Sequence, residues 1–177
     1  MNPPFDINDK TNPSHDVTQY TKHHFSNEDM TDKQQILDAI PHRDPFLFVD
    51  EIVQWDEKEI VCKKTFTGEE FFYAGHYPGH PLTPGVLLCE AAMQAGAIFL
   101  AKYFRETHVD ETGMPVVGRM NDIKFRQMVR PGDEVLLHVT LTDKMKEVYF
   151  MKAKVTTGNK TAVTFTFACT FVSEEEQ

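Results

Sequence analysis

The longest apolar stretch of the chain runs from residue 84 to residue 101 and predicts a central helix. Thr83 suits the N-cap position, Pro84 suits the first helical position, and Glu90 is the single charged residue between Pro84 and Ala101. A helix that is apolar on nearly every side is buried on most of them. We therefore expect a helix of about five turns with other elements packed around it.

The other patterned segments are typical of β-strands, because they are rich in β-branched and aromatic residues and are separated by polar turns. They cover residues 46–55, 59–66, 116–120, 123–129, 134–142, 147–156 and 161–172. One buried helix and about six antiparallel strands make an α+β domain whose curved sheet packs around the helix. Such a sheet has open edges, and two copies commonly cover them by pairing edge to edge.

The two ends of the chain differ from this domain. Residues 1–30 are polar and show no period of 2 or 3.6, which is typical of a poorly ordered extension. Thr31 and Gln34 form a plausible capping box, so order is expected to begin there with a short helix that Pro41 ends. We therefore expect one domain over residues 31–172, followed by an acidic tail at residues 173–177.

The composition is that of an ordinary globular protein, since 41% of the 177 residues are hydrophobic and 25% are charged. The formal net charge is −9, yet residues 33–172 hold 18 acids and 16 bases, so most of the excess acid lies at the ends. An acidic chain argues against nucleic acid as a partner. Three scattered cysteines fit a reducing compartment, and neither a membrane span nor a signal peptide is predicted. We expect a cytoplasmic protein.

Glu90 is the first candidate for chemistry. Gln94 follows one turn later on the same helix face, so the two residues could form a solvated stripe. Alternatively, apolar neighbours such as the aromatic segment 71–73 disfavour the charged carboxylate. A carboxylic acid that stays protonated near neutrality suits general-acid catalysis.

The second candidate is His76. It lies in segment 75–85, which contains three prolines and three glycines and must be a stiff irregular loop. A single loop histidine is more often structural, but an imidazole in a restricted backbone is a ready general base. His80 follows four residues later, yet the prolines forbid the helix that a zinc pair needs, so no metal site is predicted.

The start of the long helix is the third candidate. The backbone N–H groups near Gly85 and Val86 lie at the positive end of the helix dipole, where they could stabilise an oxyanion or serve only as the helix cap. Gly85 would leave room for a substrate carbonyl. Base, acid and oxyanion donor together suit proton abstraction beside a carbonyl with loss of a β-substituent.

Three motifs resemble the FabZ branch of the 3-hydroxyacyl-acyl-carrier-protein dehydratases. They are PHRDPFLFVD at 41–50, GHYPGHPLTPGVL at 75–87 with EA at 90–91, and FR at 125–126 with VRPGD at 129–133. The resemblance covers the chain from about residue 33 to residue 172. It implies a hot-dog fold and a homodimer whose sheets join edge to edge, often grouped as a trimer of dimers.

The resemblance also implies roles for the candidate residues. The residues matching His76 and Glu90 form each active site from different subunits, the N–H of the residue matching Gly85 binds the thioester carbonyl, and no metal or organic cofactor is used. The substrate arrives on acyl carrier protein, an acidic partner, so basic residues near the entrance should matter. By position the candidates are Lys102, Arg105, Arg119, Lys124, Arg126 and Arg130.

The predicted function is the dehydration of 3-hydroxyacyl thioesters on acyl carrier protein to trans-2-enoyl thioesters, with His76 as base and Glu90 as acid. The pathway would be fatty-acid or a related lipid or polyketide biosynthesis. Two alternatives stay open. One is a hot-dog acyl thioesterase in which Glu90 activates water, and the other is a non-catalytic subunit that binds acyl carriers.

Overall fold

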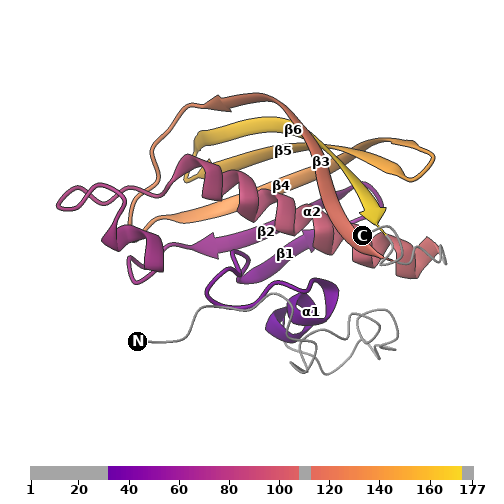
Figure 1. Ribbon diagram of the computed structural model, residues 1–177, viewed down its shortest axis with the longest axis horizontal. Coiled ribbons are helices and arrows are strands. Elements are labelled where there is room, and N and C mark those ends of the chain that lie inside the picture. Colours follow the sequence, from indigo (N-terminus) through magenta and orange to yellow (C-terminus); the bar gives the residue numbers. More distant parts are fainter. Residues whose placement is uncertain (1–31, 108–112, 173–177) are drawn as a thin grey trace, which may run out of the picture.

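The computed structural model describes residues 32–107 and 113–172, in which one curved sheet wraps around a single long helix (Figure 1). The predicted extension of residues 1–30, the cap at Thr31 and the acidic tail of residues 173–177 lie outside the described residues. The proposed domain boundaries at both ends therefore stay predictions.

All six strands of the described chain belong to one antiparallel sheet, with the order β1-β2-β4-β5-β6-β3. Their bounds are β1 (Glu51–Trp55), β2 (Glu59–Thr65), β3 (Met114–Phe125), β4 (Glu134–Met145), β5 (Val148–Thr157) and β6 (Lys160–Val172). Neighbours in the sheet are mostly neighbours in sequence, but β3 lies at the far edge beside β6. The prediction of an α+β domain with about six antiparallel strands is confirmed.

The long helix α2 (Gly85–Thr107) lies across the concave side of the sheet (Figure 1). Ile98, Phe99 and Leu100 are completely buried, which confirms the prediction of a central buried helix. The helix meets the length and hydropathy requirements of a membrane span, but more than half of that stretch is buried inside this fold. α2 is therefore the core helix of the domain.

The predicted end of α2 was too early, because the helix continues past Ala101 to Thr107. The continuation carries Tyr103 and Phe104, which extend the packed face. The ring of Tyr103 stacks on Phe99, with 5.9 Å between centroids, and Phe104 meets Tyr149 edge to face at 5.2 Å.

The helix lies close against the sheet at Gly96. A Cβ atom at this position would lie 2.8 Å from the ring of Phe167 on β6 and 3.3 Å from the sulfur of Met151 on β5. The absence of a side chain thus lets the helix rest directly on the two strands.

The short helix α1 (Asp32–Ala39) packs against β1 and α2. It ends before Pro41, as predicted. The guanidinium of Arg43 donates hydrogen bonds to the carbonyls of Leu37, at 3.0 Å, and Ile40, at 2.8 Å. These bonds satisfy carbonyls at the helix end and fasten the chain that follows it.

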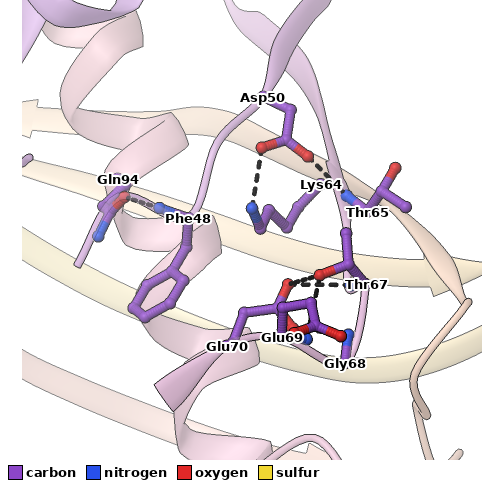
Figure 2. A network of polar contacts seen from close by, with 9 residues as sticks. All are labelled: Phe48, Asp50, Lys64, Thr65, Thr67, Gly68, Glu69, Glu70 and Gln94. Carbon is purple, nitrogen blue, oxygen red and sulfur yellow. Dashed lines mark hydrogen bonds and ion pairs between the residues drawn. The ribbon is translucent and has the colours of Figure 1, made fainter. Parts of the chain in front are cut away.

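The first predicted strand was too long, because β1 begins only at Glu51. Residues 46–50 before it belong to no strand and are held in part by bonds with side chains. Phe48 donates its backbone N–H to the side-chain oxygen of Gln94 at 2.8 Å, and Asp50 accepts hydrogen bonds from the Lys64 ammonium and the Thr65 N–H (Figure 2). We call residues 46–50 the clamped segment. An apolar pattern alone does not distinguish such a segment from a strand that is paired in a sheet.

The two strands predicted at 116–120 and 123–129 form one strand, β3, that ends at Phe125. Its pairing with β6 is irregular between Asn121 and Lys124, and Asp122 has a left-handed backbone with φ of 54°. Asp tolerates this conformation in bulges as well as in turns, so the strand continues through the irregularity.

Candidate active site

The rigid loop before α2 holds His76. It follows the 3-10 helix η3 (Phe71–Ala74), and the His76 N–H donates to the carbonyl of Phe72 at 2.9 Å. The ring nitrogen Nδ1 lies 2.7 Å from the carbonyl oxygen of Leu82. Because a carbonyl only accepts, Nδ1 carries the hydrogen, and Nε2 keeps a lone pair that can accept a proton. The predicted fixed imidazole is therefore present.

Neighbouring side chains stiffen the same loop. The ring of Tyr77 packs beside the imidazole of His76, with 4.4 Å between centroids. The hydroxyls of Tyr73 and Thr83 share a buried hydrogen bond of 2.5 Å, and the Thr83 N–H donates to the carbonyl of Val129. The Thr83 hydroxyl is thus bonded to Tyr73, and α2 begins at Gly85, so the predicted helix cap was wrong.

The predicted oxyanion donors lie at the start of α2. In residues 32–107 and 113–172, the N–H groups of Gly85 and Val86 have no hydrogen-bond acceptor. The space beside Gly85 is filled, however. A Cβ there would lie 2.7 Å from the ring of Phe125, so the expected room for a substrate carbonyl is taken by this ring in the present conformation. The Phe125 ring is half-exposed, so it has space on the solvent side into which it can move.

The carboxyl of Glu90 is held by Gln94. The Gln94 side chain is 1% exposed, so the solvated-stripe interpretation is wrong at this residue. Its Oε1 accepts from the Phe48 N–H at 2.8 Å, and its Nε2 donates to the carbonyl of Phe46 at 2.9 Å and to Glu90 Oε1 at 3.0 Å. Gln94 therefore ties Glu90 to the clamped segment shown in Figure 2.

His42 also faces Glu90, and the sequence interpretation assigned it no role. Its Nε2 lies 3.6 Å from Glu90 Oε1. Burial lowers the pKa of His42 below its ordinary value, with the Glu90 charge acting in the opposite direction and that of Arg43 in the same direction. The PHR part of the first motif was the only signal of its importance.

The candidate residues form two groups in this chain. His76 and the free N–H groups lie in and after the loop, whereas Glu90, Gln94 and His42 form a second group. In the described part of this single chain, no hydrogen bond or ion pair joins His76 to Glu90.

The basic candidates are spread over the molecule. Lys102 and Arg105 contact α1 near the C-terminal end of α2, about 25–30 Å along the helix from Gly85. They therefore lie far from the loop of their own chain. Arg119 lies over the ring of Phe150. Arg130 lines an open groove together with residues of the His76 loop and with Met128.

Among the residues described, no group of three or more His, Cys, Asp or Glu side chains lies close enough together to hold a metal ion.

Comparison with known proteins identifies the family of this chain. Residues 40–166 match the family model described as the FabA-like domain. The chain belongs to the FabA-like family. Proteins named 3-hydroxyacyl-acyl-carrier-protein dehydratase FabZ are among its relatives. The one from Oenococcus oeni is 46% identical over 114 residues, which are 64% of this chain and 78% of the relative.

The likeness extends over nearly the whole length of other relatives. The FabZ dehydratase of Aromatoleum aromaticum is 34% identical over 139 residues, which are 78% of this chain and 95% of the relative. Among solved structures, the dehydratase heterocomplex ApeI:P from Xenorhabdus doucetiae matches with a TM-score of 0.69 at 12% identity, covering 84% of this chain and 95% of that one. At this identity the match shows the fold alone, and it confirms the predicted hot-dog fold.

Proposed function

We propose that this protein dehydrates 3-hydroxyacyl thioesters carried on acyl carrier protein to trans-2-enoyl thioesters in fatty-acid biosynthesis. Membership of the FabA-like family and the FabZ relatives support this activity. The observation that carries the mechanism is the bond between His76 Nδ1 and the Leu82 carbonyl, since it leaves Nε2 as a base.

The reaction divides between the two groups of residues. His76 Nε2 accepts a proton from C2, and the electron pair of that C–H bond becomes part of the C2–C3 double bond. The C3–O bond breaks, and the hydroxyl leaves as water with a proton from Glu90. The N–H groups of Gly85 and Val86 bind the thioester oxygen while it carries negative charge. The chemistry uses no cofactor, and the two side chains exchange protons with solvent between turnovers.

The active protein is proposed to be a homodimer whose sites each combine His76 of one copy with Glu90 of the other. In the described part of one chain no hydrogen bond or ion pair joins His76 to Glu90, which agrees with this arrangement. The sheet edge formed by β3 supports it too, because this strand is long and exposes apolar side chains such as Val116, Ile123 and Phe125. A long apolar edge favours pairing with a second copy. Three such dimers would form the predicted trimer of dimers.

The proposed location is the cytoplasm, where acyl carrier protein would be the partner. Lys124, Arg126 and Arg130 lie at the end of β3 or in the segment that follows it. The neighbouring Phe125 contacts Gly85, and Arg130 lines the groove beside the His76 loop. These cations are the best placed to attract an acidic carrier. Lys102 and Arg105 are poor candidates on their own chain, because they lie at the other end of α2.

A product assay tests the proposal. The purified protein is mixed with a 3-hydroxyacyl acyl carrier protein, and enoyl absorbance and free thiol are followed together. We expect enoyl thioester without thiol release. Thiol release without enoyl product would instead identify a thioesterase, and carrier binding without turnover would identify a non-catalytic subunit. A panel of acyl lengths then defines the preferred substrate.

A further inference from the structure

The surroundings of Glu90 show which of its two oxygens is held. Gln94 is oriented without ambiguity, because the Phe48 N–H can only donate and must face Oε1, while the Phe46 carbonyl can only accept and must face Nε2. The remaining hydrogen of Nε2 points at Glu90 Oε1, 3.0 Å away. In the described chain, Glu90 Oε2 has no such partner.

His42 faces the same oxygen. Its Nδ1 is buried, with no hydrogen-bond partner in the described chain, while its Nε2 lies 3.6 Å from Glu90 Oε1. Buried N–H groups without a partner are rarer than unpaired acceptors. The hydrogen of a neutral His42 therefore belongs on Nε2, directed at Glu90. Burial lowers the pKa of His42, which favours this neutral form.

The position of His42 is fixed from both sides. Arg43 donates to the carbonyl of His42 itself at 2.7 Å, in addition to its bonds with the end of α1. On the other side, Gln94 holds the backbone at Phe46 and Phe48. The backbone around His42 is thus clamped at one end to α1 and at the other to the side chain that binds Glu90.

We propose that His42 is a positioning residue that acts with Gln94 through Glu90. Both residues direct a donor at Oε1, so the proton that Glu90 delivers is carried on Oε2, toward the substrate. When that proton leaves, the two donors stabilise the new carboxylate. The contact of 3.6 Å is longer than a hydrogen bond, and catalytic contacts commonly tighten once substrate is bound. This inference rests on the proposed role of Glu90 as the acid.

The test compares His42→Leu with His42→Gln. Leucine removes the donor, whereas the amide of glutamine can place an N–H close to the position of Nε2. We expect His42→Leu to lower kcat about 10- to 100-fold with little change in KM, as loss of a hydrogen bond to a charged group does, and His42→Gln to recover most of the loss. His138→Leu, a half-buried histidine on β4, is the matched control and should leave kcat unchanged.

A double-mutant cycle decides whether His42 acts through Glu90. In the Glu90→Gln background, His42→Leu should cause no further loss in single-turnover rate. A further loss of the same size would overturn the inference while leaving the dehydratase function intact. Failure of His42→Gln to recover the rate, in a variant that melts like the wild type, would overturn it as well. Near-normal turnover of Glu90→Gln alone would instead refute the proposed function.

Discussion

The two halves of α2 carry different kinds of residue: the first half bears the polar groups of the candidate site, and the second half does not. The first half, residues 85–94, carries the helix-start N–H groups, Glu90 and the buried amide of Gln94. The second half, residues 95–107, packs its buried apolar side chains against the sheet. A buried polar group such as Gln94 is tolerated only when its hydrogen bonds are made, whereas apolar burial stabilises without partners. Leu88, Ala91 and Ala92 of the first half are buried in the core as well, so the first half combines packing with the geometry of the site, whereas the second half supplies packing alone.

The largest expected effect belongs to the first half and to the loop before it. His76→Ala and Glu90→Gln should each lower kcat about 10²- to 10⁴-fold, because each removes one side of the acid–base pair. Their urea midpoints should stay close to that of the wild type, since neither side chain is part of the apolar core. Steady-state dehydration and urea melts measure both. Near-normal turnover in either folded variant would refute the assignment.

In the second half, Phe99→Ala should act on stability instead. The Phe99 ring is completely buried and stacks on Tyr103, so its removal should lower the free energy of unfolding by about 3–5 kcal/mol. The half-exposed Phe71 is the control, and Phe71→Ala should cost much less. Turnover per folded molecule of Phe99→Ala should stay near that of the wild type. A selective loss of kcat without destabilisation would contradict the division between the two halves.

The two glycines that meet aromatic rings offer a direct comparison between the halves. Gly96→Ala pushes a methyl group into the buried ring of Phe167, and overpacking of this kind should cost about 1–3 kcal/mol of stability. Gly85→Ala meets the half-exposed ring of Phe125, which can swing into solvent. It should melt almost normally but lose kcat, because the methyl group crowds the helix-start donors. The reverse pattern would contradict this comparison of the two glycines.

The central helix and the strands of the sheet could be predicted from the sequence, whereas the contacts of His42 and His76 could not. The apolar run of α2 and the polar turns between strands are local signals, so helix and sheet were predictable. The contact between His42 and Glu90 joins residues 48 positions apart and exists only after folding. The hydrogen position on His76 depends on the backbone carbonyl of Leu82, which no pattern of side chains encodes. The assignment of His76 and Glu90 to one shared site stays a prediction.

The smallest effect is expected from the three buried cysteines, of which only Cys89 lies in α2, in its first half. Burial raises the pKa of Cys62 to about 12 and those of Cys89 and Cys169 to about 11, so at pH 8 all three are neutral thiols. A disulfide reagent that requires a thiolate should react slowly with the folded protein. In urea it should release three equivalents of its reporter thiol per chain, one for each cysteine. Rapid reaction of Cys89 alone would show that the first half of α2 opens without global unfolding.

Mixing two inactive variants tests the central claim most directly. Chains carrying His76→Ala and chains carrying Glu90→Gln are combined in equal amounts and allowed to exchange subunits, and mixed dimers are verified with two affinity tags. If each site takes His76 from one copy and Glu90 from the other, every mixed dimer regains one intact site, and activity should return to about one quarter of the wild-type value. Verified mixed dimers that remain inactive would contradict a site shared between two copies.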